Sequence, residues 1–70
     1  MITITVTPQQ KRALDLFYEG KNYQEIALAL GVSYSRVINI LNNILVKTKT
    51  SSRKELLLLK DQITYNIVEK

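Results

Sequence analysis

The chain has 70 residues, no cysteine and no histidine, and its ten basic and six acidic residues give it a net charge of +4. The missing residue types exclude disulfide bonds, thiolate zinc sites and histidine-based catalysis, so we expect no enzymatic activity, no metal and no cofactor. A chain of this length forms one small domain. With two glycines and one proline, the composition favours an all-α fold.

The sequence gives no sign of a membrane or export segment. No apolar run approaches the roughly 20 residues of a transmembrane helix, and the N-terminus lacks the basic region of a signal peptide. We therefore expect a cytoplasmic protein with no membrane contact. Because the chain begins at Met1 with no receiver or ligand-sensing domain attached, we expect its control to lie in its abundance, in dimerisation or in a partner.

The first predicted helix follows an N-terminal stretch that alternates Ile and Thr. A short strand is one interpretation of residues 1–5, but we expect a frayed N-terminal arm. Thr7 then supplies a capping hydroxyl, Pro8 suits the first helical position, and Gln10 completes a capping box. These residues predict a helix from about Pro8 to Tyr18, ended by Gly20.

The second predicted helix is short. Asn22 and Glu25 resemble another capping box, and Gly31 provides a C-terminal stop. The helix would run to about Leu30. The next predicted helix covers residues 34–47 and is capped by Ser33. Because only Gly31, Val32 and Ser33 connect the two helices, they must cross steeply, which is the geometry of a helix-turn-helix motif. Any other small helical bundle is the alternative at this point.

The third predicted helix has two contrasting faces at 100° per residue. The inward stripe consists of Val37, Leu41, Ile44 and Thr48, with Ile38 and Ile40 beside it. Because asparagine pairs well with the adenine edge in the major groove, three asparagines on the opposite face favour DNA recognition over an ordinary solvated face. That face carries Ser35, Asn39, Asn42, Asn43 and Val46, with Arg36 and Lys47 on one flank.

The fourth predicted helix begins at the capping box of Ser52 and Glu55 and runs over residues 53–68. It has too many apolar residues for a single stripe. We expect one face to close the core and the other to form a dimer or partner interface. The core face is Leu56, Leu59, Ile63 and Ile67, and the interface face is Leu57, Leu58, Tyr65 and Val68.

Taken together, these signals resemble a known family. The stretch from Val6 to about Leu59 is similar, without gaps, to the LuxR/GerE-type DNA-binding domain, with weaker similarity to region 4 of bacterial sigma factors. The matching residues are Val6-Thr7-Pro8, Glu19-Gly20, Glu25-Ile26-Ala27, Leu30, Val32-Ser33, Val37, Ile44, Lys47 and Ser51-Ser52-Arg53. The resemblance implies a four-helix domain over residues 6–70, with the third helix in the major groove and the fourth in a homodimer contact.

The chain also departs from the family pattern. Gln10 stands where an acidic residue usually anchors the helices, and Ile38 and Ile40 stand where Lys and His are usual in the recognition helix. Tyr23 and Gln24 replace the family's Asn-Lys. Several expected contacts to DNA are therefore missing, which keeps open a partner other than DNA.

These observations lead to one main expectation and one alternative. We expect a small transcriptional regulator that binds double-stranded DNA as a homodimer. Its base-reading residues would be Ser35, Arg36, Asn39 and Asn42, and its phosphate contacts Lys21, Tyr34, Lys47, Lys49 and Arg53. The alternative, motivated by Ile38, Ile40, Val46 and the fourth predicted helix, is a helix-turn-helix module that binds and antagonises a transcription factor or a polymerase subunit.

Overall fold

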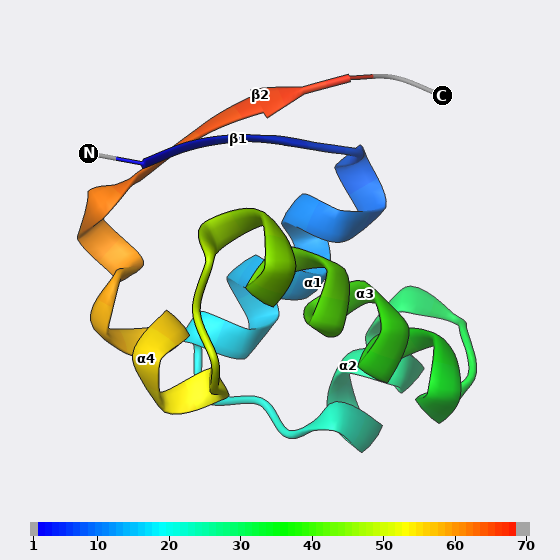
Figure 1. The fold of residues 1–70 in the computed structure, drawn as a ribbon. Coiled ribbons are helices and arrows are strands. Elements are labelled where there is room, and N and C mark those ends of the chain that lie inside the picture. The colour runs from blue at the N-terminus through cyan, green and yellow to red at the C-terminus, as the bar shows by residue number, and fades with distance from the viewer. Residues whose placement is uncertain (1, 69–70) are drawn as a thin grey trace.

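The computed structural model describes residues 2–68, which fold into four α-helices, one 3₁₀ helix and a two-stranded sheet (Figure 1). The helices form one layer and the sheet lies across its top. Among the described residues, no helix is long and apolar enough to cross a membrane. In chain order the elements are β1 (Ile2–Val6), α1 (Pro8–Tyr18), α2 (Tyr23–Leu30), α3 (Tyr34–Thr48), α4 (Arg53–Leu58), η1 (Lys60–Gln62) and β2 (Ile63–Ile67).

All four predicted helix starts are confirmed by their capping hydrogen bonds. The side chains of Thr7, Asn22, Ser33 and Ser52 each accept from a backbone N–H three residues later. Reciprocal capping boxes are complete at α1 and α2. At α4 the reciprocal bond is displaced by one residue, because Glu55 Oε1 accepts from the backbone N–H of Ser51 at 2.8 Å.

The turn between α2 and α3 depends on one left-handed residue. Gly31 has φ of 69°, a conformation in which a side chain would be strained. Its N–H bonds to Leu28 O, and the N–H of Val32 bonds to Ala27 O, so the chain reverses at once and Ser33 caps α3. The predicted helix-turn-helix connection is therefore present in the structure.

The core lies where α1, α2 and α3 meet beneath the sheet. The predicted inward stripe of α3 is confirmed, and its polar member Thr48 donates its hydroxyl to Ile44 O at 3.0 Å. Ile40, expected beside the stripe, is buried as well. The buried apolar side chains are Ile4, Val6, Ala13, Leu14, Ile26, Ala27, Val37, Ile40, Leu41, Ile44 and Leu56.

The expectation of an all-α fold with a frayed N-terminal arm is wrong for residues 2–5. Ile2–Val6 is strand β1, which pairs with β2 in parallel, with Ile2 opposite Ile63 and Val6 opposite Ile67. The alternation of Ile and Thr is the physical reason, because a strand turns successive side chains to opposite faces. Ile4 and Val6 enter the core, and Thr3 and Thr5 face solvent.

The predicted long helix over residues 53–68 is also wrong. Helix α4 ends at Leu58, and η1 leads into strand β2. Leu56 is fully buried, and its carbonyl accepts a hydrogen bond of 2.9 Å from the Tyr18 hydroxyl of α1. From Ile63 onward, the residues alternate as they do in β1, and pairing with β1 satisfies the backbone groups on one edge of this stretch. Residues 69–70, the end of the predicted domain 6–70, lie outside the described residues.

Candidate nucleic-acid interface

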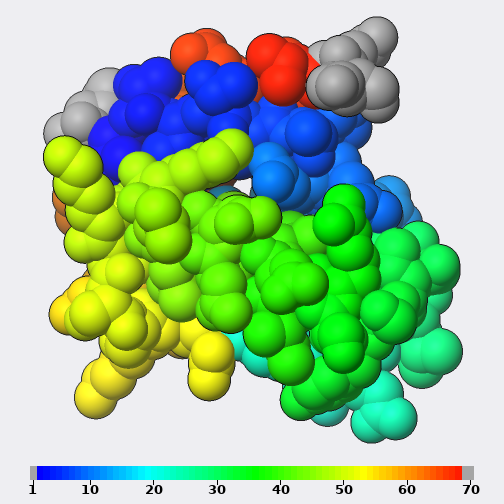
Figure 2. Space-filling view, turned by 45° about the vertical axis from the view of Figure 1, so that its right-hand side comes forward, coloured from blue at the N-terminus to red at the C-terminus, as the bar shows by residue number. Residues whose placement is uncertain are grey.

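Helix α3 turns a continuous polar face to solvent. Ser35, Asn39 and Asn42 are exposed along this face, and α3 contains no acidic residue. Val46 continues the same stripe and is 76% exposed. Figure 2 shows α3 spanning the front of the molecule below the strands. Three of the four predicted base-reading residues thus lie on one accessible helix face, together with Asn43, which is also exposed.

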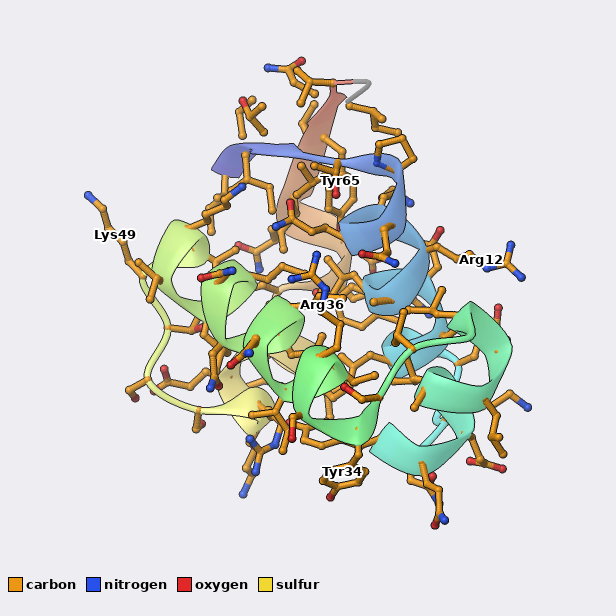
Figure 3. The ribbon with its side chains drawn as sticks, turned by 90° about the vertical axis from the view of Figure 1, so that its right-hand side faces the viewer. Arg12, Tyr34, Arg36, Lys49 and Tyr65 are labelled. Atoms are coloured by element: carbon orange, nitrogen blue, oxygen red, sulfur yellow. The ribbon has the colours of Figure 1, made fainter. Side chains whose placement is uncertain are left out.

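Two cations lie on the flank of α3 that faces α1 and β1. Arg36 Nη2 donates to Gln9 Oε1 at 3.2 Å, and Figure 3 shows Arg36 between α3 and α1. Lys47 Nζ donates to the carbonyl of Thr5 in β1 and lies 3.5 Å from Gln10 Oε1. Both side chains are exposed. The start of α1 therefore orients the two cations of α3.

Lys47, which the sequence predicts as a phosphate contact, also has a structural role in this arrangement. Its ammonium group ties the end of α3 to the outer edge of β1, 42 residues away in the chain. Gln10 shares the task, since its Oε1 also accepts from the backbone N–H of Thr7. The Gln10 amide thus both caps α1 and faces Lys47.

Two further predicted phosphate contacts meet at the N-terminal end of α3. The rings of Tyr34 and Tyr23 lie edge to face with centroids 5.8 Å apart, and the guanidinium carbon of Arg53 lies 5.1 Å from the Tyr23 centroid. Burial raises the pKa of Tyr23, and the positive charge of Arg53 partly opposes this shift. Tyr23 thus brings Tyr34 and Arg53 together, a role that sequence reasoning missed.

Lys49 marks the opposite end of α3. It is the C-cap residue, with a left-handed φ of 58°, and its side chain points away from the molecule (Figure 3). A helix of 15 residues is about 21 Å long at 1.5 Å per residue. The cations of Arg53 and Lys49 therefore flank the polar face at its two ends. Lys21, in contrast, lies in the loop between α1 and α2.

The residues of the predicted dimer face do not lie on one helix. Leu57 and Leu58 lie on α4, Tyr65 lies in β2, and Val68 follows β2. Tyr65 is half-buried, and the Lys11 ammonium lies 4.6 Å from its ring centroid. The error follows from assigning a period of 3.6 residues to a stretch that changes to a period of two.

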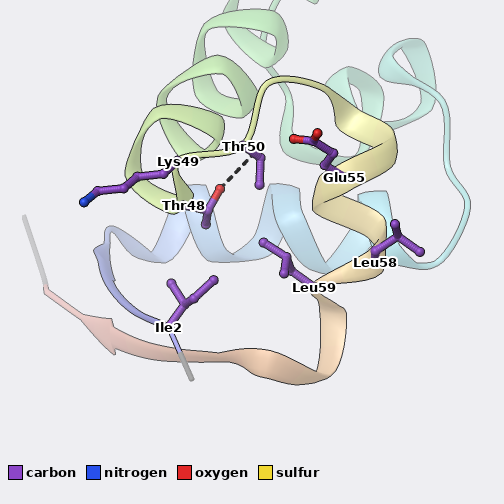
Figure 4. A pocket seen from close by; sticks show the side chains of 7 residues that line it. All are labelled: Ile2, Thr48, Lys49, Thr50, Glu55, Leu58 and Leu59. Carbon is purple, nitrogen blue, oxygen red and sulfur yellow. Dashed lines mark hydrogen bonds between the residues drawn. The ribbon is translucent and has the colours of Figure 1, made fainter.

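Leu58 instead borders a groove between β1, the end of α3 and α4 (Figure 4). The groove has a volume of about 360 Å³. Ile2 and Leu59 line its apolar part, with Lys49 and Glu55 at its margin. Glu55 is held by the Ser51 N–H, which lowers the pKa of its carboxyl.

Comparisons of the chain with known protein families, curated proteins and solved structures find no match. Within residues 2–68, no three acidic side chains gather to hold a metal ion. The functional argument therefore depends on the geometry of α3 and on the residues that surround it.

Proposed function

We propose that the protein binds double-stranded DNA through α3, in the manner of a small transcriptional regulator. The observation that carries the proposal is the outward face of α3: exposed, polar, free of carboxylates and flanked by cations at both ends. The major groove is about 12 Å wide and admits one α-helix. The tight turn at Gly31 leaves the start of α3 accessible, as a helix that enters the groove requires.

The residues divide into two sets by chemistry. Asn39 and Asn42 carry amides that can pair with the N6 and N7 atoms of adenine, and Ser35 and Arg36 lie close enough to extend this readout. Lys47, Lys49, Tyr34 and Arg53 lie at the flank or ends of α3, where they would meet phosphates of both strands. The net charge of +4 favours association with a polyanion.

Substitutions of Lys49 and Asn39 test the proposed DNA contacts most directly. Lys47 is unsuitable because its substitution would also release β1. Lys49→Gln removes a charge at the end of α3, and Lys60→Gln in η1 is its matched control. Asn39→Ala removes an amide from the recognition face, and Asn66→Ala in β2, an equally exposed asparagine, is its control.

The experiment is a fluorescence-anisotropy titration of labelled duplexes at about 50 mM and 200 mM salt. Lys49→Gln should weaken binding to all sequences and reduce the salt slope by about one unit. With a duplex selected from a random pool, Asn39→Ala should cost about 1–3 kcal/mol. Both controls should bind as the unmodified protein does. Absence of binding to any duplex at the lower salt concentration would overturn the proposal.

A protein partner is the second candidate function. Val46 on α3 is 76% exposed and Leu28 on α2 is 80% exposed, and such side chains are typical of protein contacts when they gather in a patch. Of the residues that motivated this alternative, Ile40 belongs to the core. A chain that fails to bind DNA but whose binding to a polymerase subunit or transcription factor is lost on Val46→Asp would favour this alternative.

A further inference from the structure

The two strands of the sheet differ in how their outer edges are protected. In a parallel pair, each strand directs the N–H and C=O groups of alternate residues toward its partner. The N–H of Val68 donates to Val6 O at 2.9 Å. The even-numbered residues of both strands therefore face the pairing, and the odd-numbered residues direct their backbone groups outward.

The outer edge of β1 is occupied. The carbonyl of Thr5, which points outward, accepts the ammonium group of Lys47. A lysine placed on a strand edge is one of the features by which proteins prevent that edge from pairing with another chain. Lys47 therefore protects β1 against pairing with a further strand.

The outer edge of β2 has no such protection among the described residues. Ile63, Tyr65 and Ile67 direct their backbone groups outward, and none of these groups takes part in a hydrogen bond with a side chain within residues 2–68. The strand itself, Ile-Thr-Tyr-Asn-Ile, contains no charge and no proline. A cleft of about 380 Å³ lies between α1, η1 and Tyr65 of β2.

We propose that β2 pairs with β2 of a second copy, antiparallel and about a two-fold axis, to form a four-stranded sheet in the order β1-β2-β2-β1. The register that pairs all five residues places Tyr65 opposite Tyr65 of the second copy, and Ile63 opposite Ile67. Because opposite residues in an antiparallel pair share one face, Ile67, which is 52% exposed in the single chain, would be covered by the partner's Ile63.

A second copy is the occupant that fits this edge best. Only a strand with the same alternation offers apolar residues opposite Ile63 and Ile67 and polar ones opposite Thr64 and Asn66 at once. A two-stranded sheet is marginally stable, and a two-fold pairing doubles its strands. This surface would supply the homodimer that the sequence predicts, and its relevance to DNA rests on the proposed function. Pairing itself is measured without DNA, so the two proposals can fail separately.

The first test is the mass of the purified protein by light scattering at about 100 μM, where a micromolar dimer is nearly saturated. We expect the mass of two chains. Ile67→Lys places a charge where the Ile63 side chain of the second copy would pack, and should raise the dimer dissociation constant about tenfold or more. Asn66→Lys, on the solvent face of the same strand, should leave it unchanged. A single-chain mass for the unmodified protein would overturn the proposal, and so would a dimer that Ile67→Lys leaves intact.

The second test fixes the register and uses the absence of cysteine from the chain. In the proposed pairing, Thr64 lies opposite Asn66 of the second copy with Cα atoms about 4.5 Å apart, which suits a disulfide. A mixture of the Thr64→Cys and Asn66→Cys proteins should form a covalent dimer that contains one of each. Either protein alone should cross-link far less, because its two cysteines are offset by two residues. Equal cross-linking in all three samples would contradict the register.

Discussion

Two stretches of the chain begin with equally clear capping residues and fold differently. Ser33 caps a helix of 15 residues, and Ser52 caps one of six. After Ser33, buried residues recur at helical spacing as far as Thr48, and they form one stripe that faces the core. After Ser52 that spacing ends near Leu59. The comparison teaches that a cap determines where a helix begins, whereas its length depends on whether the following side chains find a core at helical spacing.

The largest expected effect concerns the bond that joins α4, the shorter of these two helices, to α1. The Tyr18 hydroxyl of α1 donates to Leu56 O of α4 at 2.9 Å. Tyr18→Phe should lower the free energy of unfolding by about 0.5–1.5 kcal/mol, because it removes one of the two hydrogen bonds that Leu56 O accepts, the other coming from the Leu59 N–H. Urea denaturation measures this loss. Tyr34→Phe is the control, since the Tyr34 ring is 53% exposed and its hydroxyl bonds to nothing within residues 2–68.

Hydrogen exchange extends this test to the two regions separately. If α4 depends on its contact with α1, Tyr18→Phe should reduce the protection of the α4 amides more than that of the α3 amides. An equal loss in both helices would mean that the two regions unfold together. It would contradict the expectation that α4 opens separately from α3.

A smaller effect tests the conformation of residues 63–67. The change in the free energy of unfolding caused by one substitution has opposite signs in a helix and in a strand. Thr64 is exposed in β2 and pairs with Thr3 of β1. Thr64→Ala should destabilise a strand by a few tenths of a kcal/mol to about 1 kcal/mol, but it would stabilise a helix by about 0.5 kcal/mol. Urea denaturation of Thr64→Ala therefore distinguishes the two, and Thr3→Ala should give a loss of similar size. A gain in stability for Thr64→Ala would support the predicted helix over residues 53–68 and contradict strand β2.

The sequence predicts the first three helices closely because their signals are local. Caps, stops and the inward stripe of α3 each lie within a few residues of the element that they define. Strand β2 could have been found from its alternation, which repeats that of β1: Ile2 and Thr3 pair with Ile63 and Thr64. The pairing itself joins residues about 60 positions apart, so no local pattern around Ile63 contains it.

The candidate interface also has a part that the sequence predicts and a part that only the packing of the elements determines. The exposed face of α3 follows from its period of 3.6 residues, so Asn39 and Asn42 could be placed from sequence alone. The contacts of Arg36 with Gln9 and of Lys47 with Thr5 could not, because they depend on how α1 and β1 pack against α3. Tyr23 was missed for the same reason: its ring contacts Tyr34 and Arg53, residues from two other helices.

The smallest expected effect lies at the start of α4, where the two stretches meet. Glu55 Oε1 accepts from the N–H and the hydroxyl of Ser51, at 2.8 and 3.1 Å, and these bonds lower the pKa of its carboxyl below the ordinary value of 4.5. A pKa that is lower in the folded state means that the ionised carboxylate stabilises the fold. This contribution is complete above about pH 4.5 and is lost as the pH falls through the lowered pKa of the folded state.

The unmodified protein should therefore be slightly more stable than Glu55→Gln at neutral pH, and the difference should shrink toward about pH 3. Urea denaturation of both proteins at the two pH values measures this, and the other carboxyl groups cancel in the comparison. A difference that persists unchanged at the lower pH would show that the charge of Glu55 does not contribute to the start of α4.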